Sequence, residues 1–360
     1  MALPANLALA NFTNNLVKVY KQIPPVKNFL GMFFPALESN SRYLYWAVRR
    51  EGEPVAVNVL RGTEGNRNTF SISTDKVVDP PYYRESFDLT QTDLYYRAWD
   101  SALINESYMS DYMAWAAEHL QSLHNKIKRA EEVQRAQFLD TGIVTLAQGA
   151  SVDFGRTAAS KPAYSAAYDW STKTAGVSDV NPFVTIAAQC KFLRTVGKVG
   201  GGNFIIIMGD SAKAAFDTNT FVLERQRTFN MKLDDLKPPF REANGSAYHG
   251  RISAGDYTLD IFTYPEYRDV SGTPTAYLDP KKVIVIPENP VWNQGYAAVP
   301  MLPKAGTSGM DITIPGIQKG QYVVGDYVDQ RATAWIMDIK SSSIVLPTAI
   351  DMVSTNQVLA

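Results

Sequence analysis

The fold is decided by residues 102 to 140, ALINESYMSDYMAWAAEHLQSLHNKIKRAEEVQRAQFLD, which carry the strongest helical pattern in the chain. Apolar side chains recur there at steps of three and four residues and form one stripe, made of Tyr112, Ala116, Leu120, Leu123, Ile127, Ala130 and Val133. Thr141 and Gly142 follow as a stop signal. A helix of this size is about 50 Å long, far longer than most helices of globular proteins. The stripe has no heptad seam, so we expect a single spine helix and not a coiled coil.

Two further features of this stretch concern its polar side chains. Glu131 and Arg135 have the i,i+4 spacing of a favourable ion pair, which we expect on the solvated side of the helix. His119 and His124 are five residues apart, so their side chains point roughly 140° apart around the helix and cannot share a metal ion.

Residues 1 to 45 are predicted to form an N-terminal arm. Pro24, Pro25 and Pro35 interrupt any regular element, and asparagines alternate with an apolar cluster at residues 29 to 34. A segment of this kind cannot bury its aromatic side chains by itself. We therefore expect contacts with a neighbouring subunit through Phe29, Phe33 and Phe34.

Residues 46 to 80 are predicted to form an extended loop, a long β-hairpin whose first strand begins at Tyr43. Its tip, residues 61 to 68, holds two glycines, two asparagines and two arginines but hardly any apolar side chains. Such a tip projects from the core. Further inter-subunit contacts are expected from Arg61, Arg67 and Phe70.

After the long helix the pattern is a mixture of α and β, so the predicted fold class is α+β. Helices are expected at residues 184–193, 211–216 and 220–228. Buried strands are expected at residues 203–208 and 282–286, where short continuous apolar runs are bounded by Gly, Asp or Pro, and a further strand at residues 257–264. The last segment is predicted to be a strand pair, residues 333–339 and 343–347.

The composition favours a protein with a substantial core and no strong charge. Apolar residues make up 45% of the 360 residues, and 35 basic residues against 36 acidic ones give a net charge of -1. A protein that grips nucleic acid tightly through phosphates needs a basic surplus on one face, and the totals show none. The single cysteine, Cys190, excludes an intrachain disulfide and is expected to be a small buried hydrophobe.

No motif in the sequence indicates catalysis. The glycine cluster at residues 197–203 lacks the spacing of a phosphate-binding loop and precedes a strand, so we interpret it as a flexible turn. Gly209-Asp210-Ser211 does not fit the nucleophile elbow of hydrolases. We therefore expect no catalytic, cofactor-binding or metal-binding residue, no cofactor and no enzyme activity. No run approaches the 18 or so apolar residues of a membrane span, and no Lys or Arg precedes Lys18, so neither a membrane segment nor a secretion signal is expected.

Several segments, in this order and spacing, resemble the lambda-type major capsid proteins of tailed bacteriophages, the capsid protein E family. The resemblance covers nearly the whole chain. The segments that carry it are residues 29–34, residues 151–157 (SVDFGRT), residues 248–250 (YHG) leading into residues 255–264 (GDYTLDIFTY), and residues 356–360 (NQVLA).

The resemblance implies the tailed-phage and herpesvirus capsid fold of the Hong Kong phage type. It implies an arm at residues 1–45, an extended loop at 46–80, a peripheral domain at 81–182 with its spine helix at about 102–140, an axial domain at 183–315 and a return to the peripheral domain at 316–360. The implied function is self-assembly, through hexamers and pentamers, into an icosahedral shell that encloses double-stranded DNA. The implied partners are a scaffolding protein, a portal protein, a decoration protein at three-fold positions and DNA contacted without sequence specificity. The protein would be a virion component that assembles in the host cytoplasm.

Three alternatives remain open from the sequence alone. The same fold could build a nanocompartment that encloses an enzyme, although Pro24-Pro25 and the asparagine-rich start favour an arm over a cargo-binding helix. An unrelated α/β enzyme could assemble its site from scattered residues, in which case a pocket with titratable side chains is expected. A different structural protein of the virion is the third.

Overall fold

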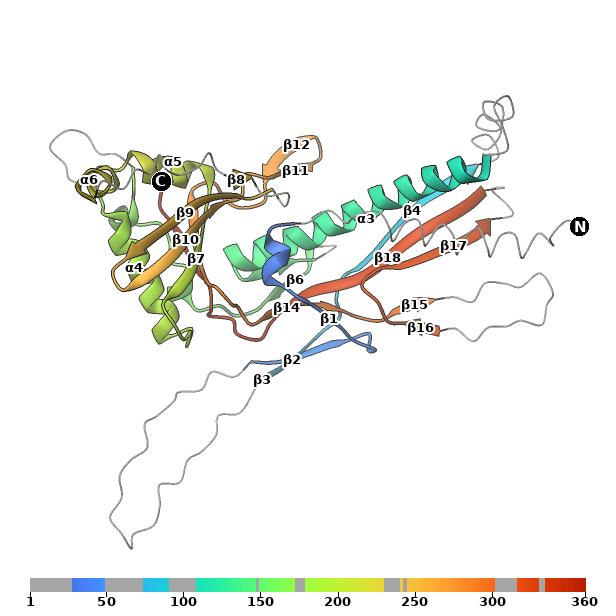
Figure 1. Ribbon diagram of the computed structural model, residues 1–360. Helices are drawn as coiled ribbons and strands as arrows, with labels where there is room; N and C mark the ends of the chain where they lie inside the picture. Colours follow the sequence, from blue (N-terminus) through green and yellow to red (C-terminus); the bar gives the residue numbers. More distant parts are fainter. Residues whose placement is uncertain are drawn as a thin grey trace, which may run out of the picture.

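The computed structural model describes residues 28–48, 74–90, 108–146, 149–171, 179–229, 240–241, 245–301, 316–329 and 334–360. These residues form an elongated molecule with two parts (Figure 1). The α3 part consists of one long helix, α3, and a five-stranded sheet. The α4 part consists of a six-stranded sheet with the helices α4, α5 and α6.

The long helix predicted from the sequence is present as α3 (Tyr108–Asp140), 33 residues in length. Its predicted beginning at residue 102 lies outside the described residues. The helix ends as expected, because Gly142 adopts a left-handed conformation (φ 73°) and its backbone N–H donates to the carbonyl of Phe138 at 3.0 Å. Side chains of the predicted stripe are buried, among them Ala116, Leu120 and Ile127.

The prediction that Glu131 and Arg135 pair on the solvated side of this helix is wrong. The pair exists, with 3.4 Å between Arg135 Nη2 and Glu131 Oε2, but both side chains are buried. Residues 131–140 are covered on almost every side by strands and by the segment around Leu30. The i,i+4 spacing predicts the ion pair, but it does not predict whether solvent or protein surrounds the pair.

The five-stranded sheet is built around β18 (Ala334–Pro347), a single strand of 14 residues. Its first nine residues pair on one side with β4 (Tyr82–Thr90), and seven of them pair on the other side with β17 (Val323–Asp329). Its last five residues pair with β14 (Trp292–Tyr296), which is parallel to β1 (Ala36–Glu38).

The predicted strand pair at residues 333–339 and 343–347 is therefore wrong, because the two predicted strands are one. The polar residues 340–343 look like a turn in the sequence, yet hydroxyls among them find partners on α3 and just before β17. Ser341 Oγ donates to the carbonyl of Gln321 at 2.8 Å, and Ser343 Oγ donates to Glu131 Oε1 at 3.1 Å.

The six-stranded sheet has the order β19-β13-β7-β10-β9-β8. Its strands are β7 (Asn203–Met208), β8 (Phe240–Arg241), β9 (Ala247–Ala254), β10 (Tyr257–Thr263), β13 (Lys282–Pro287) and β19 (Ser354–Gln357). Strand β7 is parallel to β10 and antiparallel to β13. The helices are α4 (Pro182–Thr195), α5 (Asp210–Thr218) and α6 (Thr220–Phe229). The strands and helices predicted for this region are thereby confirmed within one or two residues at most ends.

Alternate residues of the central strands divide the interior into two cores. Ile206 and Met208 of β7 point into a core shared with α4 and α5, where Ile186 and Phe216 are also buried. Ile207 points to the opposite face, into a core shared with the end of α3. Both faces of this sheet are covered, which explains the continuous apolar runs of β7 and β13.

The sheets divide the chain differently from the predicted ranges 183–315 and 316–360. Strand β14 lies within the first range but belongs to the sheet of α3, and β19 lies within the second range but joins the sheet of α4. The chain therefore passes from one part to the other again after β13 and after β18.

The prediction that Phe29, Phe33 and Phe34 are covered by a neighbouring subunit is wrong. Their residues are only 1%, 7% and 3% exposed, within their own subunit. The segment carries the 3-10 helix η1 (Leu30–Phe33) and lies in the core between the end of α3 and the sheets. Phe34 stacks on Trp292 at 5.3 Å, and Phe29 lies 5.4 Å from the ring of Phe262. The arm predicted for residues 1–27 lies outside the described residues.

The remaining described elements are short. They are the hairpins β2 (Leu44–Val48) with β3 (Thr74–Val78), β5 (Ile143–Thr145) with β6 (Ser151–Asp153), β11 (Tyr267–Val270) with β12 (Thr273–Ala276) and β15 (Val299–Met301) with β16 (Gly316–Gln318), and the 3-10 helices η3 (Ala158–Ser160) and η4 (Ala166–Tyr168). None of the helices in the described ranges is long and apolar enough to cross a membrane.

Candidate assembly surface

The hairpin formed by β2 and β3 lies at one side of the molecule (Figure 1). The two strands are antiparallel, with Leu44 opposite Val78 and Tyr45 opposite Val77. Opposite residues of such a ladder share one face of the hairpin. The predicted hairpin is thus present at its base, and residues 49–73, which connect its strands, lie outside the described residues.

One face of this hairpin is anchored to the body. Leu44 and Trp46 are buried, and the ring of Trp46 lies 5.6 Å from that of Phe154. The anchor requires a glycine in β14, because a methyl group at Gly295 would lie 2.8 Å from Cδ1 of Leu44 and 2.4 Å from Cδ1 of Leu346. The close approach of β14 therefore lets the base of the hairpin sit on the core.

The other face is apolar and uncovered. Tyr45 is 66% exposed and Val77, directly opposite, is 54% exposed. Tyr43, which precedes the strand, is exposed as well. We call Tyr43, Tyr45 and Val77 the hairpin patch. A strand with apolar side chains on both faces needs cover on both faces, and the described residues of the subunit cover only one.

An ion pair closes the base of the hairpin. Arg42 Nη2 and Asp79 Oδ2 form a hydrogen-bonded salt bridge, and the Arg42 guanidinium lies 5.3 Å from the ring centre of Tyr43. The hydrogen bond to Asp79 raises the pKa of Arg42. Both charges are exposed, so the pair orients the chain around Tyr43 and adds little to stability.

Near its C-terminal end, α3 carries a buried cluster of charges. Glu131 accepts hydrogen bonds from the hydroxyls of Tyr322 (2.8 Å) and Tyr296 (3.1 Å). Arg135 donates to Glu132 at 3.1 Å and to Gln294 at 3.2 Å. Burial raises the pKa of both glutamates, although the charge of Arg135 acts in the opposite direction. The cluster ties α3 to β14 and to the region before β17.

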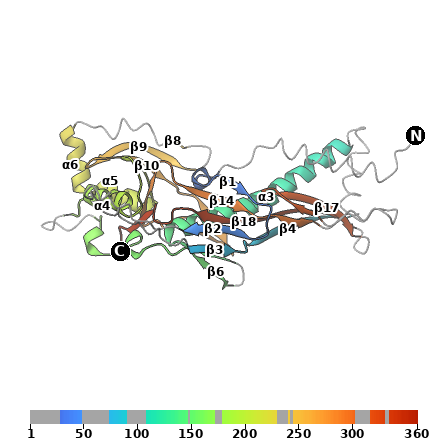
Figure 2. The ribbon, with the colours of Figure 1, turned by 90° about the horizontal axis from the view of Figure 1, so that it is seen from below.

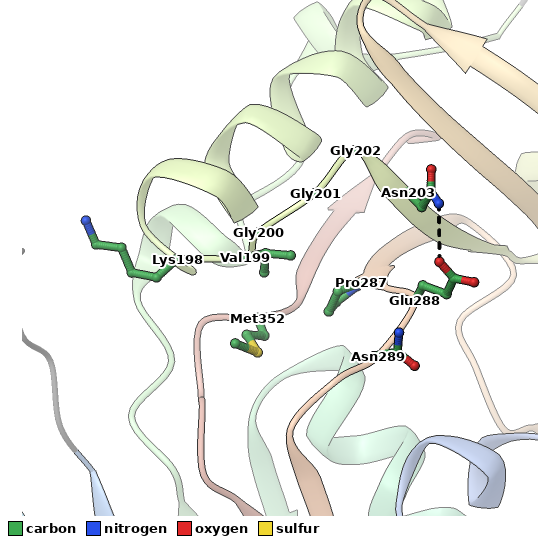
Figure 3. Close-up of a pocket in the computed structure, with 10 residues that line it drawn as sticks. All are labelled: Lys198, Val199, Gly200, Gly201, Gly202, Asn203, Pro287, Glu288, Asn289 and Met352. Carbon is green, nitrogen blue, oxygen red and sulfur yellow. Dashed lines mark hydrogen bonds between the residues drawn. The ribbon is translucent and has the colours of Figure 1, made fainter.

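The glycine cluster after α4 forms one wall of an open pocket of about 270 Å³ (Figure 3). Gly200, Gly201 and Gly202 face Glu288 across this pocket, and Asn203 Nδ2 donates to Glu288 Oε2 at 3.4 Å. Lys198 lies at its edge and points away from the pocket (Figure 3). A carboxylate in this position disfavours a phosphate, so the pocket does not support a phosphate-binding site.

The remaining candidates for chemistry are in structural positions. Cys190 is buried in the core of the α4 part, and burial raises the pKa of its thiol to about 12, which agrees with the predicted role as a small hydrophobe. His119 and His124 do not share a site, since His124 packs on Tyr322 and His119 on Trp115. Within the described ranges, no group of three or more His, Cys, Asp or Glu side chains could hold a metal ion.

The described part of the structure places three of the six predicted contact residues. Phe29, Phe33 and Phe34 are in the core, while Arg61, Arg67 and Phe70 lie outside the described residues. The hairpin patch was not predicted. A signal for it exists in the sequence, because Tyr43-Leu44-Tyr45-Trp46 is apolar at every position and so predicts a strand that needs cover on both faces.

Comparison with known proteins gives one family and a set of similar structures. The model of a family described as phage major capsid protein E matches residues 12–357. The structure of a protein assigned as the capsid protein of a prophage in E. coli CFT073 is 15% identical with a TM-score of 0.60, and the match covers 100% of both chains. A phage-related protein from Bordetella bronchiseptica RB50 is 11% identical with a TM-score of 0.53, and the match covers 96% of both chains.

An encapsulin from Synechococcus elongatus PCC 7942 is also similar, at 9% identity over 94% of this chain and 89% of that chain. Its TM-score of 0.41 is too low to support an argument about function. No curated protein matches the chain.

Proposed function

This chain belongs to the phage major capsid protein E family and is a shell-forming capsid protein, and we propose that the hairpin patch is the surface through which it packs on the next subunit of the shell. Its fold is the tailed-phage capsid fold that the resemblance implied, which confirms the predicted fold class. The observation that carries the proposal is the exposed pair Tyr45 and Val77 on a hairpin whose other face is anchored in the core.

The physical support is the imbalance between the two faces of the hairpin. Aromatic side chains contribute large contact areas, and tyrosine is enriched at the centres of protein interfaces. Each contact of this size is weak alone, but a closed shell repeats it many times and ties every subunit to several others. The charge of -1 also suits a container for DNA, since a strongly basic wall would bind the genome by counterion release.

We extend the proposal to the parts of the shell. The α4 part would lie at the centres of hexamers and pentamers and the α3 part at their edges, in an icosahedral shell around double-stranded DNA. Arg61, Arg67 and Phe70, in the segment between β2 and β3, would add contacts beyond the hairpin patch. A scaffolding protein, a portal protein and a decoration protein at three-fold positions would be its partners, and assembly would take place in the host cytoplasm. The protein would catalyse no reaction.

The assembly surface is tested with the double variant Tyr45→Ser/Val77→Ser. We expect subunits with unchanged circular dichroism and unchanged unfolding midpoint that no longer sediment as shells. The matched control is Tyr267→Ser, because Tyr267 is also exposed, at 56%, but lies on the separate hairpin of β11 and β12. Normal shells from the double variant, or an equal loss in the control, would contradict the proposal.

The contents of the shell are tested separately. Shells purified from cells that also express the neighbouring genes should protect double-stranded DNA from nuclease. Shells that instead contain one enzyme and no protected DNA would favour the nanocompartment.

A further inference from the structure

Arg156 lies at the junction between the two parts of the molecule and bonds to both. Its Nη1 donates to the last carbonyls of α3, those of Phe138 (3.2 Å), Leu139 (2.8 Å) and Asp140 (3.3 Å). Its Nη2 donates to the carbonyl of Val353 at 3.3 Å and to Thr355 Oγ1 at 3.2 Å, at the beginning of β19. The second end of the guanidinium thus reaches the sheet of the α4 part.

Further bonds fix the loop that carries Arg156. The guanidinium also donates to the carbonyl and to the hydroxyl of Ser160, at 3.0 and 3.2 Å. The backbone N–H and the hydroxyl of Thr157 donate to Asp351 at 3.0 and 2.9 Å. Asp351 lies between β18 and β19, on one of the segments that connect the two parts. All five donor hydrogens of a guanidinium are therefore used, in one fixed plane.

The site of Arg156 is closely fitted. The residue is 5% exposed, and burial lowers its pKa to about 10, so that it stays charged at neutral pH. A side chain at Gly142 would collide with it, since a methyl group there would lie 2.5 Å from Cδ of Arg156. A buried guanidinium that ends a helix also offsets the negative end of the helix dipole.

Two other polar contacts cross the same junction. Lys282 Nζ, on β13, pairs with Asp140 Oδ1 at the end of α3 at 2.7 Å. The hydroxyl of Thr355 donates to the carbonyl of Leu139 at 2.6 Å. The end of α3 is thus held by β13 and β19, the two strands at one edge of the six-stranded sheet.

The apolar contacts at this junction hold the parts together but do not fix their angle. Phe138 and Leu139 of α3 share a core with Ile284 and Ile286 of β13. Apolar burial is non-directional, so it tolerates small rotations that keep the area covered. The hydrogen bonds of the Arg156 guanidinium are directional, because a hydrogen bond weakens steeply when its angle changes.

The pocket beside the glycine cluster leaves room for such a rotation. It is bounded by Gly200–Gly202 of the α4 part and by Glu288, Asn289 and Met352, which belong to the two segments that connect the parts (Figure 3). Here open space lies between the glycine cluster and the two connecting segments. Because the pocket leaves space for movement, the angle between the α3 part and the α4 part depends on the hydrogen bonds of Arg156.

We propose that Arg156 is a positioning residue that sets the angle between the α3 part and the α4 part, and thereby the curvature of the shell. This inference rests on the proposed function, since curvature exists only if the subunits form a closed shell. Each subunit contributes the same angle to every contact that it makes. A rotation of a few degrees therefore accumulates around the shell and changes its diameter or prevents closure.

The test compares Arg156→Ala with Val222→Ala, a control on α6 in the core of the α4 part, where Val222 is 1% exposed. Particle diameters are measured by electron microscopy, and the unfolding midpoints of the free subunits are measured alongside. We expect both variants to lower the midpoint. Arg156→Ala alone should give shells whose mean diameter differs from the parent by a tenth or more, or open curved sheets.

Two milder variants keep the test decisive if Arg156→Ala does not fold. Arg156→Lys retains the charge but cannot reach both parts at once, and Thr355→Val removes one acceptor of the guanidinium at nearly constant volume. Both should shift the diameter in the same direction as each other and by less than Arg156→Ala. Parental diameters in all variants that fold would overturn the inference, as would an equal shift in Val222→Ala. Failure of the parent protein to form shells would instead overturn the proposed function.

Discussion

The backbone N–H of Leu30 donates a 2.9 Å hydrogen bond to Oε1 of Glu132, a buried carboxylate near the C-terminal end of α3. This bond joins residues about a hundred positions apart and anchors the aromatic segment against the helix. The bond belongs to a buried cluster in which Arg135 pairs with both Glu131 and Glu132. The cluster therefore holds two acidic groups and only one basic group. Substitution of Arg135 and substitution of one glutamate should therefore lower the free energy of unfolding by very different amounts.

We expect Arg135→Met to lower the free energy of unfolding by about 3–5 kcal/mol, because it leaves two buried carboxylates without a cation. Glu131→Gln should cost about 1 kcal/mol or less, since it leaves one matched pair of Glu132 and Arg135 and keeps an acceptor for Tyr322. Urea unfolding of the free subunits measures both. Equal losses would show that charge balance does not govern this cluster.

Phe34→Ala should lower the free energy of unfolding of the isolated subunit by about 3–5 kcal/mol. The ring stacks on Trp292 and is 3% exposed, so its cover comes from the same chain. The loss should be the same at low and high protein concentration. If it appeared only in assembled shells, the ring would be covered by a neighbour, as the sequence had suggested.

Acid should destabilise the subunit through His124. Burial of this α3 side chain beside Tyr322, together with the charge of Lys128, lowers its pKa from 6.5 to about 4. The unfolded chain thus binds the proton more tightly, and stability contributed by the neutral ring is lost as the pH falls from about 6.5 to 4. The loss reaches at most about 3 kcal/mol. His124→Met should flatten the dependence of unfolding on pH in this range, whereas the control His119→Gln should leave it in place.

Gly295→Ala should loosen the base of the hairpin. The added methyl group would overlap the ends of both Leu44 and Leu346, and overpacking of this kind costs about 1–3 kcal/mol. We expect faster proteolysis between β2 and β3 and a change in tryptophan emission from Trp46. Gly200→Ala is the control, because nothing lies within 4 Å of a methyl group at that position. Identical cleavage rates in the two variants would contradict this account of the anchor.

Local patterns were sufficient to predict the α-helices and the strands β7, β10 and β13. The stripe of α3 and the apolar runs of β7 and β13 follow from the periods of helices and buried strands, which depend on neighbouring residues alone. The end of α3 at Asp140 follows from Gly142 for the same reason.

The features that were missed depend on distant partners. Ser341 and Ser343 look like a turn until Gln321 and Glu131 supply bonds for their hydroxyls, and only then does β18 continue as one strand. Phe29, Phe33 and Phe34 look uncovered until Trp292, Phe262 and the end of α3 surround them. The hairpin patch differs from these residues, because its apolar pattern can be read from neighbouring residues. Its exposure, however, depends on which parts of the folded subunit lie beside it.

The length of β18 has a mechanical consequence. The strand runs along the long direction of the molecule, beside α3, in both views (Figures 1 and 2). Its ladder bonds lie across that direction, as in any antiparallel sheet. A pull that stretches the subunit therefore shears many of these bonds at once and cannot unzip them one after another. A wall of such subunits would resist stretching by a pressurised interior along the axis of its longest strand.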